Sequence, residues 1–339
     1  MRRILMALAS ATILLSALSA SAAVDDVNFQ QWFDASCQGE LKIPKAVAQR
    51  AAEFRYVFLG GLKNESMGGY FAQNMKALRA LGVPKRAIHE LHSRTRKPME
   101  DNVAALREDL QRVAGEGPER LVIIAHSRGA CEVMAFALEN NDFVSDHVEA
   151  MFLVQGPFGG TGLADYLQGE GEPIDGQMSR GQRAMVRITV GLERVFLRRC
   201  NRQAMPELTH NASREFWDDM LFEYSDAVPI VSPKTFFVQS QVDPSQLRLL
   251  PRAAASYLQT YYGPNDGLVG VRDQSLPGLG TCLGPIDCGH ADLTLKFPRS
   301  RAPKCFRKAL VESIVMTVGQ EGQAARDAKR EVRADRAGD

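Results

Sequence analysis

Continuous apolar runs recur along the chain and predict the strands of a sheet. Each run is short, rich in branched or aromatic side chains and bounded by turn residues, as strands buried on both faces are. The strong candidates are residues 56–59, 121–125, 150–154 and 235–238, and a weaker candidate is 87–91.

Between these runs, apolar residues recur at the spacing of a helix. Residues 70–81 and 103–113 each place apolar side chains on one face. Residues 129–138 are apolar on nearly every side, which indicates a helix buried in the core. Strands that alternate with helices in this way predict an α/β fold, with a parallel sheet and helices on both of its faces.

A long insertion, roughly residues 157–232, separates the last two strong strand candidates. It opens rich in Gly and Pro and continues with basic helical material around residues 194–202. An insertion of this size in such a fold is typical of a cap over a site rather than of a structureless loop. A separate domain is the alternative, although its core would be small.

The two ends of the chain differ in composition from the rest. Residues 1–23 match a secretory signal peptide, with two arginines, an apolar run and the small-residue cleavage pattern Ala20-Ser21-Ala22. We therefore expect a periplasmic or secreted protein, with an uncleaved membrane anchor as the alternative. The last 21 residues, 319–339, include ten charged residues and a single Val. They predict a flexible charged tail or a surface tether that follows a domain spanning 24–318.

Overall composition places the chain among ordinary globular proteins. It is 45% hydrophobic and 24% charged over 339 residues, which excludes disordered, collagen-like and multi-span membrane classes. The 41 Lys and Arg nearly balance the 40 Asp and Glu, and removal of the two leader arginines leaves 39 against 40. We therefore expect no nucleic-acid partner.

Six cysteines become available for disulfides if the chain is exported. Six cysteines allow 15 connectivities, and the sequence does not choose among them. The spacing of Cys282 and Cys288 suits a small loop staple, whereas Cys131 lies in the apolar stretch 129–138 and is expected to be a buried free thiol. None of the spacings resembles a zinc site. The others are Cys37, Cys200 and Cys305.

A candidate nucleophile stands at the end of the strongest strand, in Ala125-His126-Ser127-Arg128-Gly129. A nucleophile elbow places its serine on a sharp turn from strand to helix, with small residues two before and two after it. Ala125 and Gly129 meet that requirement. His126 is expected to point to the opposite side of the strand and to be packed in the core. An ordinary strand-to-helix turn is the alternative.

A serine hydroxyl needs a base that a third group orients. The base and the acid follow the serine in chain order after such an elbow, so the candidate bases are His147, His210 and His290. We favour His290, which sits in a Cys-Gly-His-Ala-Asp loop after the last sheet segments. The turn 263–269 can present Asp266 as the acid. Its rivals on chain order alone are Asp243, Asp273, Asp287 and Asp292.

The elbow, the turn at 265–269 and the loop at 289–292 together resemble the α/β-hydrolase superfamily, most of all its secreted bacterial lipases and esterases. Residues 156–165 resemble the segment after the next strand in those lipases, and 206–209 resemble their lid region more faintly. The resemblance covers about residues 55–295. It implies the α/β-hydrolase fold, a mostly parallel doubly wound sheet with a helical cap, and a triad of Ser127, Asp266 and His290.

The oxyanion of the transition state needs backbone N–H donors, and losing one typically costs on the order of 3 kcal/mol. One donor should be Arg128, directly after the nucleophile. The resemblance gives Leu62 as the second, in Gly60-Gly61-Leu62, where those lipases carry His-Gly-apolar. It also implies a structural calcium ion held by Asp243 and Asp292, with solvated surface carboxylates as the alternative.

These observations predict a secreted serine hydrolase that cleaves small-molecule or lipid esters through an acyl-enzyme, with transient contact between the cap and a lipid surface. The chemistry itself requires no cofactor. Thioesters, polyesters and amides are alternative substrates, because the triad is the same for all of them. A non-catalytic binding protein that keeps the fold is a further alternative.

Overall fold

The computed structural model describes residues 28–62, 64–66, 68–172, 183, 206–295 and 303–319. The expected signal peptide lies outside these ranges, as do residues 320–339 of the expected tail and most of the middle of the expected cap. Within the described ranges, no helix is both long and apolar enough to cross a membrane.

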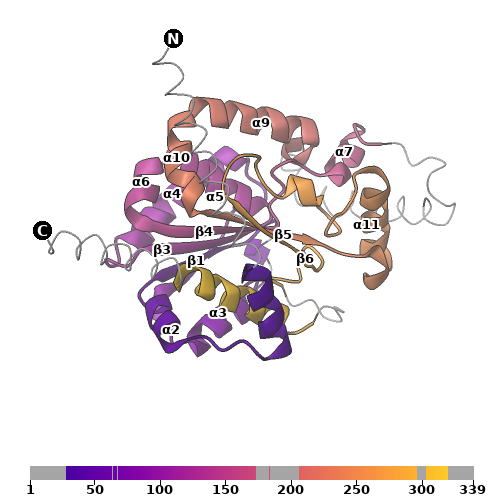
Figure 1. Cartoon of the computed structure of the whole chain (residues 1–339). Coiled ribbons are helices and arrows are strands. Elements are labelled where there is room, and N and C mark those ends of the chain that lie inside the picture. Colours follow the sequence, from indigo (N-terminus) through magenta and orange to yellow (C-terminus); the bar gives the residue numbers. More distant parts are fainter. Residues whose placement is uncertain are drawn as a thin grey trace, which may run out of the picture.

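A six-stranded sheet forms the centre of the molecule (Figure 1). Its strands lie in the order β2-β1-β3-β4-β5-β6, and every neighbouring pair is parallel. Their bounds are β1 Arg55–Leu59, β2 Ile88–Leu91, β3 Leu121–His126, β4 Val148–Val154, β5 Thr235–Gln241 and β6 Thr281–Asp287. The chain runs from β1 to β2 on one side of the sheet and then crosses back to β3 on the other side of β1, so the strand order switches between β1 and β3. In such sheets, ligands bind beyond the carboxyl ends of the strands at this switch point.

Five of these strands were expected from their apolar runs, but β6 was not. Its sequence Thr-Cys-Leu-Gly-Pro-Ile-Asp lacks a continuous apolar run, and only two of its side chains are buried. It is an edge strand that pairs only with β5, and edge strands tolerate the Gly284 and Pro285 that interrupt its pattern.

Helices cover both faces of the sheet. They are α2 Lys45–Ala51, α3 Ala72–Ala80, α4 Met99–Ala114, α5 Arg128–Glu139, α6 Asn141–His147, α7 Gly162–Gln168, α9 His210–Glu223, α10 Val228–Val231 and α11 Leu249–Tyr261, with further helical residues at 28–38 and 306–319. The helices expected over 70–81, 103–113 and 129–138 correspond to α3, α4 and α5. Helix α4 begins four residues earlier than expected, directly after Pro98.

Alternate residues of each central strand pack into two separate cores. In β1, Val57 and Leu59 face the core built with α4 and α5, whereas Tyr56 and Phe58 face the core built with α3 and the helical residues 28–38 and 306–319. This alternation follows from the twofold repeat of an extended strand. The parallel sheet is therefore buried on both faces, as the apolar runs predicted.

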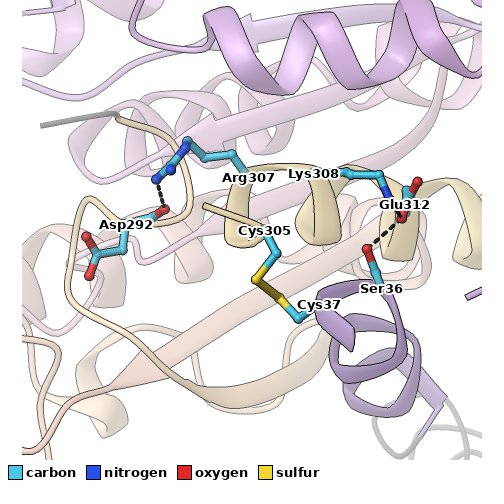
Figure 2. Close-up of a disulfide and its surroundings, with 7 residues drawn as sticks. All are labelled: Ser36, Cys37, Asp292, Cys305, Arg307, Lys308 and Glu312. Atoms are coloured by element: carbon cyan, nitrogen blue, oxygen red, sulfur yellow. Dashed lines mark hydrogen bonds and ion pairs between the residues drawn. A yellow bond between two sulfur atoms is a disulfide. The ribbon is translucent and has the colours of Figure 1, made fainter. Parts of the chain in front are cut away.

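One disulfide joins the two ends of the described chain (Figure 2). Cys37, in the helical residues 28–38, is bonded to Cys305, directly before the helical residues 306–319. Beside it, the Ser36 hydroxyl donates a 2.5 Å hydrogen bond to Glu312. The disulfide closes a sequence separation of 268 residues and ties together two helices on the same face of the sheet.

The staple expected between Cys282 and Cys288 is wrong, because both are free thiols, Cys282 exposed and Cys288 buried. Six residues of extended strand span roughly 20 Å, far more than a disulfide bridges. Cys131 is free and buried, which confirms that expectation. Cys200 lies outside the described residues.

His210 joins α7, α9 and the short turn Val271–Asp273. Its Nδ1 is hydrogen-bonded to Asp165, its Nε2 lies 3.4 Å from an Asp273 oxygen, and its ring stacks on Tyr262. Burial lowers the pKa of His210, but the hydrogen bonds and charges of the two aspartates outweigh it and raise the pKa from 6.5 to about 9. The imidazolium therefore bridges two carboxylates at neutral pH.

Loss of the disulfide should destabilise the protein through the unfolded state. Cys37→Ser with Cys305→Ser should lower the free energy of unfolding by about 2–4 kcal/mol, because a very long loop is no longer closed. Urea denaturation of wild type and variant measures the difference. The control is Cys282→Ser, which removes an exposed free thiol and should leave the midpoint unchanged. Equal midpoints for the double variant and wild type would contradict the pairing.

The His210 bridge should make stability fall in alkaline solution. A folded pKa raised above the unfolded value adds stability that is fully present below about pH 6.5 and is lost as pH rises through about 9. The melting temperature of wild type should therefore drop between pH 7 and 10 by more than that of His210→Asn. His147→Asn, at an exposed position ending α6, is the matched control and should keep the wild-type profile. Parallel profiles for wild type and His210→Asn would refute the bridge.

Candidate active site

Ser127 sits at the sharp turn between β3 and α5. Its φ of 56° is left-handed, a conformation that residues other than glycine rarely adopt. A hydrogen bond of 2.9 Å from its N–H to the Val154 carbonyl holds the turn against β4. A side chain at Gly129 would place Cβ 2.6 Å from the Gly60 carbonyl oxygen, so glycine is required there. These features are those of the elbow that the sequence predicted.

The structure brings together the three residues expected to form a triad. His290 Nε2 lies 2.9 Å from Ser127 Oγ, and His290 Nδ1 lies 2.9 Å from Asp266 Oδ2. The backbone N–H of His290 also donates a hydrogen bond to the backbone carbonyl of Asp266 at 2.8 Å. Because Nδ1 faces a carboxylate, Nδ1 carries the proton and Nε2 accepts from the serine hydroxyl. The ring is thus oriented for proton transfer between Oγ and Nε2.

The turn that carries Asp266 supplies two backbone donors to its buried carboxylate. Oδ1 accepts hydrogen bonds from the backbone N–H groups of Leu268 and Val269, at 2.9 and 2.8 Å. Oδ2 accepts from His290, with Ser240 Oγ at 3.5 Å and Gln274 Nε2 at 3.4 Å as longer partners. A buried carboxylate is tolerated where donors surround it in this way.

The rival acids and bases occupy other places. His147 ends α6, and His210 forms the bridge with Asp165 and Asp273. Asp243 accepts from the Ser245 N–H in a short turn, and Asp287 accepts from a Gln241 side chain on the sheet edge. Among the five carboxylates that chain order allowed, Asp266 is the one bonded to His290.

The glycine-rich loop after β1 lies against the serine. A Cβ at Gly61 would stand 2.7 Å from Ser127 Cβ and 3.1 Å from its Oγ, so only glycine permits this approach. Leu62 follows directly and is half-buried. The other expected donor, the Arg128 N–H, begins helix α5, whose N-terminus favours negative charge. The oxyanion roles of Leu62 and Arg128 stay predictions.

The Arg128 side chain has a position that the sequence did not indicate. It is buried, donates to the Lys97 carbonyl at 2.8 Å, and pairs with Glu207 at 3.0 Å. Glu132, one helical turn along α5, lies 3.6 Å away. Burial raises the pKa of Glu132 to about 7, and the Arg128 charge lowers it in part. The guanidinium thus anchors the start of α5 to the segments that carry Lys97 and Glu207.

Two buried residues next to His290, His126 and Tyr70, were expected from the sequence to pack in the core, and no hydrogen-bonding role was predicted for them. His126 is buried as expected, and its ring centroid lies 4.9 Å from that of His290. Tyr70, which the apolar spacing assigned to a helix face, directs its hydroxyl at His126 Nδ1 over 2.6 Å. Their partners are remote in sequence, so no local pattern could have revealed the contact.

The two expected calcium ligands lie in separate turns. Asp292 Oδ2 accepts from the Gly289 N–H at 2.9 Å, while Asp243 caps the turn at Ser245. In the part of the chain that the structure describes, no group of three or more His, Cys, Asp or Glu residues could hold a metal ion. Calcium takes six to eight oxygens, and these residues do not assemble such a set. Asp243 and Asp292 as calcium ligands stay a prediction.

Comparison with known proteins supports the fold independently of the site. No family model and no curated protein sequence matches the chain. Among solved structures, it is similar to a metagenomic carboxyl esterase, with a TM-score of 0.54 and 19% identity over 80% of this chain and 76% of that chain. It is also similar to the mature Bacillus licheniformis lipase BlEst2, with a TM-score of 0.52 and 18% identity over 71% of this chain and 86% of that chain. With its parallel sheet and elbow, the chain has the α/β-hydrolase fold.

Proposed function

We propose that this protein is a serine hydrolase that cleaves carboxylic esters of acyl or lipid character. The observation that carries the proposal is the continuous hydrogen-bonded path from Ser127 Oγ through His290 to Asp266. The fold, shared with a carboxyl esterase and a lipase, agrees with it. The signal-like residues 1–23 support a periplasmic or secreted site of action.

The proposed reaction proceeds in two steps. Ser127 Oγ attacks the ester carbonyl carbon while His290 Nε2 takes the hydroxyl proton, and the imidazolium then gives that proton to the departing alcohol. The acyl group remains on Oγ. Water attacks this acyl-enzyme as His290 removes a proton, and return of that proton to Oγ releases the acid. Asp266 holds the ring and stabilises its charged form in both steps.

Negative charge develops on the carbonyl oxygen in each tetrahedral intermediate. The proposed donors are the N–H groups of Arg128 and Leu62, on the two segments that meet at Ser127. Each donor is worth about 3 kcal/mol in the transition state. The Arg128 guanidinium already has partners in Lys97 and Glu207, so its proposed contribution comes from its backbone alone.

An acyl substrate fits the exposed apolar residue beside the acid. Leu268, two residues after Asp266, is 41% exposed, and Phe222 in α9, at 87%, is the other exposed large apolar side chain among the described residues. Such a residue offers contact to a hydrocarbon chain. We also propose that the cap contacts a lipid surface transiently. Thioesters, polyesters and amides remain alternative substrates, since the triad treats their carbonyl groups alike.

Covalent labelling tests the nucleophile. A fluorophosphonate probe should label the wild-type protein and should not label Ser127→Ala, because the probe phosphonylates only an activated serine. Asp266→Asn should lower kcat by about 10⁴, since the ring loses its correct tautomer. Heat-denatured wild type is the labelling control, and circular dichroism confirms that each variant is folded. Absence of label on folded wild type would reject the hydrolase and favour a binding protein.

A p-nitrophenyl ester series tests the substrate class. We expect kcat/KM to rise with acyl length, because each buried methylene contributes about 0.8 kcal/mol to binding. Matched thioesters and anilides serve as comparison substrates and should react more slowly. Activity confined to acetyl and butyryl esters would contradict the lipid preference, and faster thioester or anilide cleavage would contradict the ester preference. A chelator in the same assay tests the predicted calcium ligands: a loss of rate that calcium restores would support Asp243 and Asp292, and unchanged rates would contradict them.

A further inference from the structure

A line of buried polar groups runs behind the proposed triad, from the glycine-rich loop to the histidine loop. The Gly61 N–H lies 3.3 Å from the Tyr70 hydroxyl, which lies 2.6 Å from His126 Nδ1. His126 Nε2 lies 2.6 Å from the carbonyl oxygen of His290. The line thus begins beside the proposed oxyanion donor Leu62 and ends on the backbone of the proposed base.

The direction of each hydrogen bond follows from Gln155. Its Nε2 donates to the Gly289 carbonyl at 3.2 Å, so its Oε1 is the atom 3.0 Å from His126 Nε2. His126 Nε2 therefore faces two oxygens that can only accept, those of Gln155 and His290, and it must carry the ring proton. The neutral ring then accepts at Nδ1.

The remaining bonds have one consistent arrangement. Because His126 Nδ1 accepts, the Tyr70 hydroxyl must donate to it. The Tyr70 oxygen is then available to accept from the Gly61 N–H. Protons along the line therefore all point toward the His290 carbonyl, and the line contains no formal charge.

Burial keeps the line neutral. Tyr70 is 3% exposed and His126 is 1% exposed. Burial, together with the charge on His290, lowers the pKa of His126 to about 3, and burial raises the pKa of Tyr70. His126 therefore keeps its proton on Nε2 across the working range of pH. It can hold the His290 carbonyl without competing for the proton that the triad moves.

We propose that Tyr70 and His126 are positioning residues. Through this neutral line of hydrogen bonds, called the relay below, they fix the glycine-rich loop at residues 60–62 and the loop that carries His290 relative to each other. The inference rests on the proposed hydrolase function, but neither side chain is assigned a contact with substrate. Removal of the Tyr70 hydroxyl would leave the Gly61 N–H and His126 Nδ1 without these partners. Both loops could then shift, and a displacement of about 1 Å can cost about 100-fold in rate.

Tyr70→Phe tests the relay, with Tyr56→Phe as its matched control. The Tyr56 hydroxyl is also fully buried and also bonds a backbone group, donating to the Ala51 carbonyl at 3.1 Å near the start of β1, whereas Tyr70 bonds to Gly61 beyond the end of that strand. Both variants lose one buried phenolic hydroxyl and should lose similar thermal stability. Only Tyr70→Phe should lower kcat, by about 10- to 100-fold, with KM changed less than about threefold because substrate contacts persist. Equal kcat for the two variants would overturn the relay.

Nitrogen NMR of the protein labelled on histidine tests the proton positions in the wild-type chain itself. His126 should show a protonated Nε2 and an unprotonated Nδ1, both unchanged between pH 5 and pH 9. His126→Gln, which removes these signals, provides their assignment. A proton on Nδ1, or titration within that range, would overturn the relay. The proposed function can fail separately, because unlabelled folded wild type in the fluorophosphonate experiment would reject it while the NMR result stands.

Discussion

Ser127 is held in a left-handed backbone conformation where β3 meets α5, and the neighbouring segments are shaped around it. A turn this tight brings the strand end, the helix start and the loop after β1 within van der Waals distance. Gly129 and Gly61 lack side chains at the two closest approaches, where a Cβ would lie 2.6 and 2.7 Å from its neighbours. Arg128 begins α5 directly after this turn, and Leu62 directly follows Gly61 in the loop. Geometry at a single residue thus determines how closely these three segments approach one another.

The histidine loop depends on a different part of the molecule, the C-terminal helical residues 306–319. Arg307 donates to the carbonyl oxygen of Asp292 at 2.9 Å (Figure 2). It also donates to the carbonyl oxygen of Leu295 at 3.2 Å. Burial lowers the pKa of the Arg307 guanidinium, and the charge of Asp292 opposes that shift. The disulfide from Cys305 anchors the start of this helix. The loop that carries His290 is therefore held by a helix that the disulfide ties to the helical residues 28–38.

Sequence alone predicted the parts of the site whose constraints are local. Ser127 follows an apolar strand and has a small residue two positions before it and two positions after it. The close approach of strand and helix imposes this pattern within five consecutive positions. His290 and Asp266 were selected by chain order and resemblance, with rivals that only spatial contacts could separate. Strand β6 was missed because its Gly and Pro interrupt the apolar pattern, and its edge position allows that. The pairing of Cys37 with Cys305 was out of reach, since it depends on how two helices pack across 268 residues.

Gln155 connects the two sets of hydrogen bonds that hold His290, and its own backbone is left-handed, with a φ of 54°. Its amide nitrogen bonds to Ser240, whose hydroxyl lies 3.5 Å from the Asp266 carboxylate that holds the imidazole ring. Its amide oxygen lies against His126, which holds the backbone of the same histidine. Strained backbone persists only where the surroundings over-determine it, and this amide is fixed at both ends. Ring and backbone of His290 are thus constrained through one neutral side chain. In the proposed mechanism, the proton between Ser127 Oγ and His290 Nε2 can therefore move without breaking this framework.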